Sequence, residues 1–481
     1  MKMYDKYKDN VKYLSEKLSV EKSFDMIKRE IQVDSKNATL FYIDGFVKDD
    51  IMLWLIKILQ ESSREDIVPN TLTKLMTKKI PYVECSKSDT LDDIEYMVLS
   101  GATALLIDGM EKAIILDTRT YPARGPKEPD LERVTRGSRD GFVETVIFNT
   151  ALIRRRIRDP NLTFEITKVG RRSQTDVVIG YIGDITNEDL IKSLKQKLDK
   201  VNTDSLVMAE KSLEEFILGQ NWNPFPQAKF TERPDVAAAH LLEGHVIVIV
   251  DTTPSVMILP VTLFHFTQHA EDYYQNPAIG TYMRWIRFVA ISLSLIITPL
   301  WLLLATNNQL LPQALSFIGP KEVGEIPLLV QFLILEIGLD MLRIASIHTP
   351  NALTTSLGII GALLLSDFAV KVGWFIPETV LYTAISGIGM FATPSIEFSL
   401  AIRLFRILLI ISTGIFKVYG FIGGLILFLI TIFRTKSFGG INYLWPLIPF
   451  NGRALRTILT RKPIPEVKIR PEILRPKDKD S

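Results

Sequence analysis

The sequence predicts an α/β N-terminal half with two related subdomains, followed by an all-α C-terminal membrane domain of four to six helices. Charged residues are dense up to Arg287 and after Arg434, and sparse between them. Phe288–Thr306 is a charge-free apolar run, and about 20 such residues cross a hydrocarbon core of about 30 Å. In the N-terminal half, one pattern of strands and helices occurs twice.

The chain has 481 residues, enough for several domains. Its first residues are rich in Lys, Asp and Glu and lack an apolar core, so we expect no secretory signal there. The domains that we expect are an N-terminal helical arm (1–34), α/β subdomain 1 (35–130), α/β subdomain 2 with an interfacial helix (131–285), a transmembrane domain (286–436) and a basic cytoplasmic tail (437–481).

The number of membrane crossings stays open between four and six. Because the tail is rich in Lys and Arg, the positive-inside rule places it on the cytoplasmic side with the N-terminal half, which requires an even number. Six crossings require that the segment with Arg403 and Arg406 spans. The further candidate segments are Ile326–Ile347, Ala352–Val372, Phe375–Ala392, Phe398–Phe416 and Val418–Phe433.

Aromatic and basic residues gather just before the first span. Such residues typically anchor a helix at the membrane–water boundary. We therefore expect membrane-interface anchors at Tyr273, Tyr274, Arg284, Trp285 and Arg287.

No motif indicates a cofactor, a metal site or catalysis. Cys85 is the sole cysteine, which excludes an intrachain disulfide and makes a Cys-ligated zinc site improbable. His265 and His269 lie four apart, but a metal would need further ligands, and an interfacial amphipathic helix is favoured. Because the sequence lacks a Walker loop, a GxSxG elbow and a CxxC pair, we expect a protein that is not an enzyme.

The repeated pattern has two parts. Tyr42-Ile-Asp-Gly45 is followed by a helical run to Leu59, and Tyr181-Ile-Gly-Asp184 by a run to Leu198. Each predicts a strand, a turn and an amphipathic helix.

The second part predicts a β-hairpin in each copy. Gly101 and Gly244 each precede an aspartate by seven residues, and a second apolar strand follows each aspartate, at Ala113–Leu116 and Val256–Leu259. The apolar stretch 246–266 could otherwise be taken for a membrane segment. Its parallel with 101–116 favours a hairpin instead.

Several phrases in order resemble the spore germination receptor A-subunit family, the GerA type, over about residues 40 to 450. The short N-terminus and the stretch 393–397 resemble the stage V sporulation protein AF branch. Thr252, where the family often has Gly, and Ile344, where it often has an acid, depart from the pattern. The phrases are RGSRDGF at 136–142 with Glu144, NTALIRRRIRD at 149–159, ERPD at 232–235, the stretch from Glu243 through Asp251 to Pro254, EDYY at 271–274, and Glu336 with DMLR at 340–343.

The resemblance implies a multi-pass protein of the bacterial spore inner membrane. Family members are thought to assemble into homo-oligomeric rings, pentamers by this resemblance, that act as ion channels in germination. The AF branch is thought to amplify the release of monovalent cations. The implied partners are the lipid bilayer, other copies of the chain, a second small membrane protein and other germination proteins, with no nucleic acid.

Charges inside the apolar half are candidates for an ion pathway, because charges in membrane segments usually face a bundle interior or a water-filled path. The alternative is internal pairing, with Asp340 and Arg343 three apart on one helix face. The pathway candidates are Glu336, Asp340, Arg343, Asp367 and Glu397.

Two further features concern contacts between helices or subunits. Gly420 and Gly424 have the GxxxG spacing that lets helices approach closely, within one subunit or between two. Three successive arginines, Arg154 to Arg156, could suggest nucleic acid binding, but a solvated face or a contact with a neighbouring subunit is favoured. In a ring, they and nearby charged residues would contact the next subunit. The subunit-interface candidates are Arg136, Arg139, Glu144, Arg154 and Arg155.

Three functions remain open from the residues alone. An oligomeric ion channel is the leading hypothesis. A secondary transporter of ions or small solutes is the first alternative, although the duplication is seen only in the soluble half and not among the membrane segments. A non-conducting scaffold for germination partners is the second.

Overall fold

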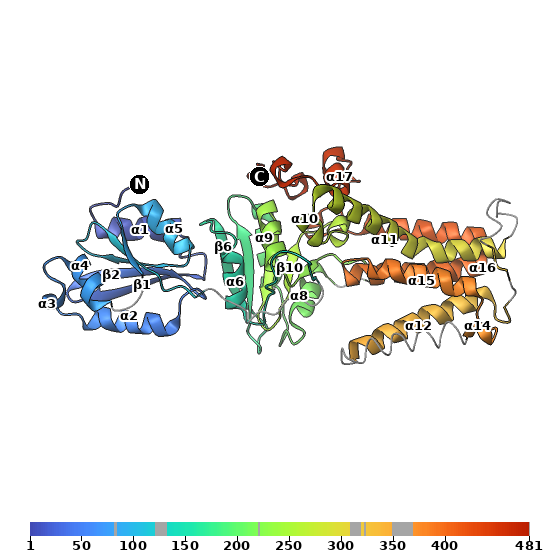
Figure 1. Cartoon of the computed structure of the whole chain (residues 1–481), viewed down its shortest axis with the longest axis horizontal. Helices are drawn as coiled ribbons and strands as arrows, with labels where there is room; N and C mark the ends of the chain where they lie inside the picture. The colour runs from blue at the N-terminus through green and yellow to red at the C-terminus, as the bar shows by residue number, and fades with distance from the viewer. Residues whose placement is uncertain are drawn as a thin grey trace. The chain divides into compact units, whose positions relative to one another are not determined.

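A computed structural model describes residues 1–80, 84–120, 132–219, 222–307, 319–321, 324–348 and 369–480 (Figure 1). The chain divides into two compact units. Unit 1 comprises Met1–Gln220, Ala228–Pro260 and Ile464–Ser481, and unit 2 comprises Asn221–Gln227 and Val261–Pro463.

The first subdomain of unit 1 is an antiparallel five-stranded sheet of order β1-β2-β4-β5-β3. Its strands are β1 (Met26–Val33), β2 (Lys36–Ile43), β3 (Cys85–Ser88), β4 (Thr103–Ile107) and β5 (Ala113–Leu116). Its helices are α1 (Tyr7–Lys17), α2 (Asp49–Glu61), α3 (Arg64–Ile67), α4 (Thr71–Lys74), the π-helix η1 (Leu75–Lys79) and α5 (Leu91–Leu99).

Helices cover both faces of this sheet (Figure 1). Leu14 of α1 and Ile94 of α5 share one core with Phe41 of β2. Leu59 of α2 shares the opposite core with Leu40. Because neighbouring strand residues point to opposite faces, Leu40 and Phe41 contribute to different cores.

The second subdomain is an antiparallel five-stranded sheet of order β6-β7-β9-β10-β8. Its strands are β6 (Leu162–Val169), β7 (Thr175–Ile182), β8 (Lys229–Thr231), β9 (Val246–Val250) and β10 (Val256–Leu259). Its helices are α6 (Val146–Arg154), α7 (Glu188–Asp199), α8 (Ala209–Leu218) and α9 (Pro234–Glu243).

The two subdomains have the same strand order, which confirms the predicted duplication. Backbone hydrogen bonds repeat as well. The N–H of Asp108 donates to Asn37 O at 2.8 Å, and the N–H of Asp251 donates to Asp176 O at 2.9 Å. The first bond joins the β4–β5 turn to β2, and the second joins the β9–β10 turn to β7.

The duplication also includes α1 and α6. Asn10 accepts from the N–H of Tyr4 and donates to its carbonyl, and Asn149 does the same with Val143, each six residues earlier. Both asparagines are buried. One buried side chain thus satisfies both backbone polar groups of one residue at the same place in each copy.

The β9–β10 hairpin confirms that the apolar stretch after Gly244 is not a membrane segment. Thr252 in its turn has a φ of 75°, the value that Gly109 has in the first copy. This left-handed conformation strains a β-branched residue. The N–H of Thr252 donates to Glu144 O at 2.7 Å, which helps to hold the turn.

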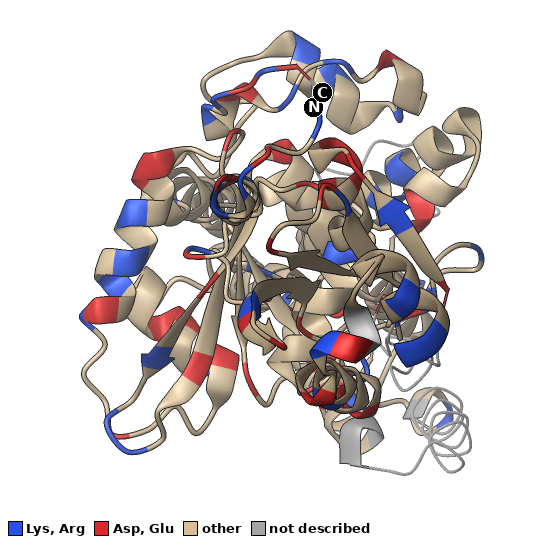
Figure 2. Cartoon of the chain, turned by 90° about the vertical axis from the view of Figure 1, so that its left-hand side faces the viewer, with Lys and Arg blue, Asp and Glu red and all other residues tan. Residues whose placement is uncertain are grey.

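The structure differs from the helical arm expected at residues 1–34. Residues 26–33 form β1, and Leu14 and Leu18 beside α1 enter the first core. Two successive exposed residues, Arg29 and Glu30, interrupt the alternation expected of a half-buried strand, so the local pattern does not indicate β1. The side of unit 1 displayed in Figure 2 carries interspersed basic and acidic residues, as a solvated surface does.

Unit 2 is helical in its described residues. Two of its helices, α11 and α16, are long and apolar enough to cross a membrane by length and composition. Its elements are η2 (Leu263–Phe266), α10 (Glu271–Tyr274), α11 (Pro277–Thr306), α12 (Leu328–His348), α14 (Ala369–Lys371), α15 (Pro377–Phe391), α16 (Ile396–Arg434), η6 (Phe438–Gly440) and α17 (Gly452–Leu459); the 3-10 turns η7 (Ile464–Glu466) and η8 (Glu472–Leu474) follow in unit 1.

Helix α16 is two helices joined at a sharp reversal. Lys417 has non-helical angles, with φ 52° and ψ −126°. A Cβ added at Gly420 would collide with the carbonyl oxygen of Ser412, and one at Gly424 would collide with Leu409. The GxxxG glycines therefore pack the second half of α16 against the first, within one chain.

The segment that was expected to form one interfacial helix with both histidines forms three elements instead, which are η2, α10 and the start of α11. His265 lies in η2, where its Nδ1 accepts from the N–H of Thr262 at 3.0 Å. His269 lies between η2 and α10. Pro277 then begins α11, in the first turn where proline is tolerated.

Candidate functional site: an ionic cluster between apolar helices

Four charged side chains meet where α12 packs on α16. Glu336 and Asp340 lie four apart on α12, so they share one face of that helix. Arg403 and Arg406 lie three apart on the first half of α16. We call these four residues the α12–α16 ionic cluster.

Arg406 forms the centre of the cluster. Its Nε and Nη2 donate to the two carboxylate oxygens of Glu336, each at 2.8 Å. Its Nη1 donates to the carbonyl and hydroxyl oxygens of Ser294 on α11, at 2.8 and 2.9 Å. Both charged side chains are almost fully buried, with exposed fractions of 0% and 1%. The two-point geometry partly offsets the large cost of burying both charges.

Arg403 links the two acids. Its Nη1 lies 2.5 Å from Asp340 Oδ1, and its Nη2 lies 3.4 Å from Glu336 Oε2. Its Nη2 also donates to the carbonyl oxygen of Glu336. The Asp340 side chain is 41% exposed, whereas that of Arg403 is only 3% exposed. Asp340 is therefore the member of the cluster that the chain itself does not enclose.

The sequence-predicted pathway residues have different surroundings. Glu336 and Asp340 meet arginines of α16, and the internal pair expected between Asp340 and Arg343 is not the one that forms. Arg343 is partly buried and Glu397 is exposed. Asp367 lies outside the described residues. Sequence reasoning noted Arg403 and Arg406 without pairing them, although their three-residue spacing in an apolar segment was a usable signal.

Further polar contacts join the helices of unit 2. Gln331 Oε1 of α12 accepts from the N–H of Ile376 at 3.1 Å and from the hydroxyl of Thr379 at 2.9 Å. The hydroxyls of Thr298 on α11 and Ser386 on α15 lie 2.5 Å apart. Helix α15 is thus hydrogen-bonded to both α11 and α12, and such bonds between helices contribute to association in an apolar solvent.

The expected interface anchors divide into exposed aromatics and buried arginines. Tyr273 and Trp285 are exposed, Tyr274 is half-buried, and Arg284 and Arg287 are buried. The structure adds a contact for the arginines that the sequence did not indicate.

The acidic partner of Arg284 and Arg287 is Asp272, which is fully buried. Its carboxylate accepts from Arg287 Nη1 and Nη2 at 2.8 and 2.9 Å. Arg284 Nη1 donates to the carbonyls of Thr457 and Ile458, both at 3.0 Å. These bonds fix the start of α11 to α10 and α17. The anchor role itself stays a prediction.

Arg154 was expected at a subunit interface, but its side chain is fully buried within unit 1 and cannot reach another subunit. Its Nε and Nη2 donate to Asp25 at 2.9 and 3.0 Å, and its Nη1 donates to Leu162 O at 2.9 Å. Ser23, two residues before Asp25, accepts from the N–H of Phe164 in β6 at 3.0 Å. Arg154 therefore holds the two subdomains together.

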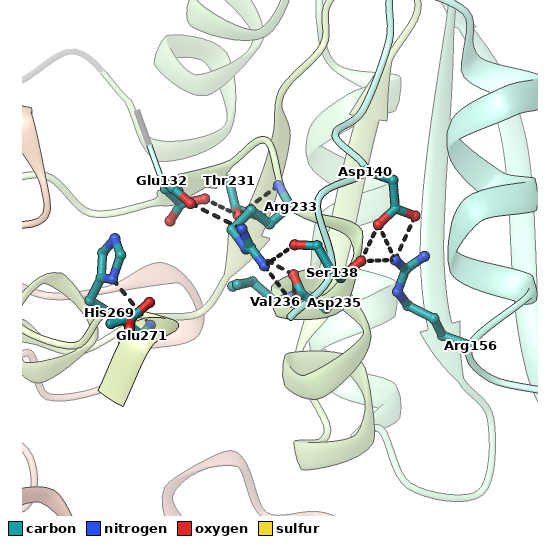
Figure 3. A network of polar contacts seen from close by, with 10 residues as sticks. All are labelled: Glu132, Ser138, Asp140, Arg156, Thr231, Arg233, Asp235, Val236, His269 and Glu271. Carbon is teal, nitrogen blue, oxygen red and sulfur yellow. Dashed lines mark hydrogen bonds and ion pairs between the residues drawn. The ribbon is translucent and has the colours of Figure 1, made fainter. Parts of the chain in front are cut away.

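The other interface candidates, Arg136, Arg139, Glu144 and Arg155, are exposed. The segment that carries the first three is held in place within unit 1 by two contacts, one with a fully buried arginine and one partly exposed (Figure 3). Each contact is formed by an arginine.

Arg233, fully buried at the start of α9, donates to Asp235 and to the carbonyls of Glu132 and Ser138. Arg156 pairs with Asp140 at 2.6 Å. Burial alone would raise the pKa of Asp140, but hydrogen bonds from Arg156 and Ser138 outweigh burial and lower that pKa. Figure 3 also shows, in unit 2, His269 accepting from the N–H of Glu271.

Comparison with known proteins places the chain in a family. Residues 12–473 match the family described as Bacillus/Clostridium GerA spore germination protein. The chain belongs to the GerA family. Among curated GerA relatives, stage V sporulation protein AF of Bacillus subtilis is 42% identical over 479 residues, covering 100% of this chain and 97% of that protein. Spore germination protein KA of the same organism is 31% identical over 471 residues, covering 96% and 86%.

A solved structure within the GerA family is also similar. It is the N-terminal domain of the A subunit of the Bacillus megaterium spore germinant receptor GerK3. That domain is 28% identical, the match covers 54% of this chain and 96% of that chain, and the TM-score is 0.43.

Proposed function

We propose that this GerA-family protein is a subunit of an oligomeric ion channel that acts in spore germination, in the spore inner membrane. It releases monovalent cations or amplifies their release, and the two acids of the α12–α16 ionic cluster lie along the cation route. Both ends of the chain lie on the cytoplasmic side. Its partners are other copies of the chain and other germination proteins.

The exposed surface of unit 2 supports a membrane location. Apolar patches of this extent are typical of membrane or subunit contacts. The large exposed apolar side chains include Val289 on α11, Ile337 and Met341 on α12, Ile388 and Phe391 on α15, and Leu404, Ile411, Ile415, Ile422, Ile426 and Leu429 on α16.

The observation that carries the channel proposal is the ionic cluster itself. Charges among apolar helices are costly and often mark ion paths. Here two arginines neutralise two acids, and one acid, Asp340, is accessible. Arg403 holds Asp340 by an ion pair, so the cluster is a closed arrangement. Freeing Asp340 from Arg403 would expose a carboxylate that attracts cations.

The test is potassium efflux from liposomes that contain the purified full chain. We expect efflux down the gradient that does not saturate, and faster efflux from Arg403→Gln because that change frees Asp340. A matched control is Arg434→Gln, which removes an exposed arginine at the end of α16.

Two outcomes would overturn the proposal. Saturable uptake coupled to a second gradient would identify a transporter. Absence of flux in both the wild type and Arg403→Gln, with retained binding of other germination proteins, would identify a scaffold.

A further inference from the structure

The segment between α16 and the end of unit 2 has a one-sided charge. From Thr435 to Pro463 it holds five basic residues, Lys436, Arg453, Arg456, Arg461 and Lys462, and no acidic residue. Arg453 and Arg456 are exposed on α17. Asn451 caps this helix, since its Oδ1 accepts from the N–H of Ala454 at 3.1 Å.

Exposed apolar side chains directly precede this basic helix. Leu447, Ile448 and Phe450 are 42%, 41% and 74% exposed. Neighbouring Tyr443 and Trp445 are buried, so the loop is anchored at one end while its tip is exposed. An exposed apolar tip beside exposed arginines is the pattern of segments that lie in the membrane–water interface.

Contacts with α11 fix the depth of α17. Arg284 donates to the last carbonyls of α17, and the N–H of Arg461 donates to Thr281 at 3.0 Å. Arg284 lies four residues, about 6 Å along the helix axis, before the apolar run that begins at Phe288. The headgroup layer on each side of a bilayer is of similar thickness, about 5–8 Å. Helix α17 therefore lies at the level of the headgroups.

We propose that Leu447–Arg456 is a binding surface for anionic phospholipid. The apolar tip enters the boundary of the acyl chains, and Arg453 and Arg456 bind the headgroup phosphates. The proposal rests on the membrane location proposed above, but not on ion conduction. Charge decides the occupant, because a zwitterionic leaflet offers little net attraction to a segment that has no acids.

Because Cys85 is the single native cysteine, replacing it leaves one introduced cysteine as the labelling site. Phe450→Cys in a Cys85→Ser background carries a nitroxide label, and the full chain is placed in nanodiscs of phosphatidylcholine with increasing phosphatidylglycerol. We expect the label to move deeper, with rising collision with oxygen, as phosphatidylglycerol increases. Each arginine near the surface contributes about 1 kcal/mol, so Arg453→Gln or Arg456→Gln should raise the half-maximal phosphatidylglycerol fraction roughly fivefold.

The control is Arg171→Gln, an equal charge change at an exposed position of unit 1. A label depth that did not change with the phosphatidylglycerol fraction would overturn the proposal. An equal shift of the half-maximal fraction in the control variant would also overturn it. The same response to inorganic phosphate in detergent would also overturn it, because it would indicate a site for free phosphate. None of these readings depends on ion flux, so they are separate from the channel proposal.

Discussion

Each unit of the molecule contains an arginine that binds a carboxylate through two nitrogens, with both side chains almost completely buried. In unit 1, Arg154 binds Asp25, which lies 129 residues earlier. In unit 2, Arg406 binds Glu336, which lies 70 residues earlier. The same chemistry thus joins two subdomains in one unit and two helices in the other.

The surroundings of the two pairs differ. Arg154 donates further bonds to Ser23, Asp159 and Leu162, and its guanidinium lies 5.2 Å from the Phe164 ring. Arg406 has one further partner, Ser294, among apolar helices. The pair in unit 1 is therefore one part of a polar network. The pair in unit 2 is the main compensation for two buried charges, so breaking it should cost more.

The largest effect is expected from Arg406→Met. This change removes the two-point partner of the buried Glu336 and leaves it only the Arg403 guanidinium, 3.4 Å away, which should destabilise unit 2 by about 3–5 kcal/mol. The measurement is the thermal unfolding midpoint of the full chain in detergent. The double variant Glu336→Met with Arg406→Met should recover most of the loss, since apolar residues can replace a buried pair. If the double variant were no more stable than the single one, the loss would not come from an unpaired charge.

The second effect concerns Asp25→Asn. The asparagine oxygen can still accept from Arg154 but carries no charge, so we expect a loss of about 2–3 kcal/mol. Hydrogen exchange of peptides that cover β1 and β6 in the full chain measures it. Exchange should rise in both subdomains, because Arg154 joins them. A rise confined to β1 would contradict the joining role.

The smallest effect concerns the partly exposed pair of Asp140 and Arg156. Because the folded pKa of Asp140 lies below its ordinary value of 3.8, the pair contributes stability above that value and loses it as pH falls through the folded pKa. Asp140→Asn should remove about 0.5–1 kcal/mol at neutral pH and little in acid. Calorimetric unfolding of the full chain between neutral and acidic pH measures this loss of stability. An equal loss at neutral and at acidic pH would exclude the ion pair as the cause.

The sequence predicted the features that depend on local pattern. The two hairpins follow from Gly and Asp at matched spacing, and both the duplication and the non-membrane character of β9 and β10 follow from them. The apolar composition likewise predicted the end of α11 at Thr306 and the two halves of α16, although α11 begins at Pro277, before the predicted span. Burial periodicity and turn residues are contained in short windows, which is why these predictions succeeded.

The buried pairs could not be predicted in this way. Arg154 was predicted at a subunit interface together with the neighbouring Arg155, and its partner Asp25 is far away in the chain. The break at Lys417 lies between the two predicted spans Phe398–Phe416 and Val418–Phe433, so its position was predicted, but the packing of the second half of α16 against the first was not. Pairing across helices depends on tertiary packing, which no local spacing specifies.

The most direct test of the ion route is the reversal potential of the purified protein in a planar bilayer under a potassium chloride gradient. Asp340 is the accessible acid, and Asp340→Asn leaves Arg403 with less counter-charge in the route. We predict that the wild type favours potassium over chloride and that Asp340→Asn shifts the reversal potential toward chloride. Glu61→Gln, at the exposed end of α2, should leave it unchanged. A reversal potential that is the same in the wild type and Asp340→Asn would contradict the placement of the α12–α16 ionic cluster on the cation route.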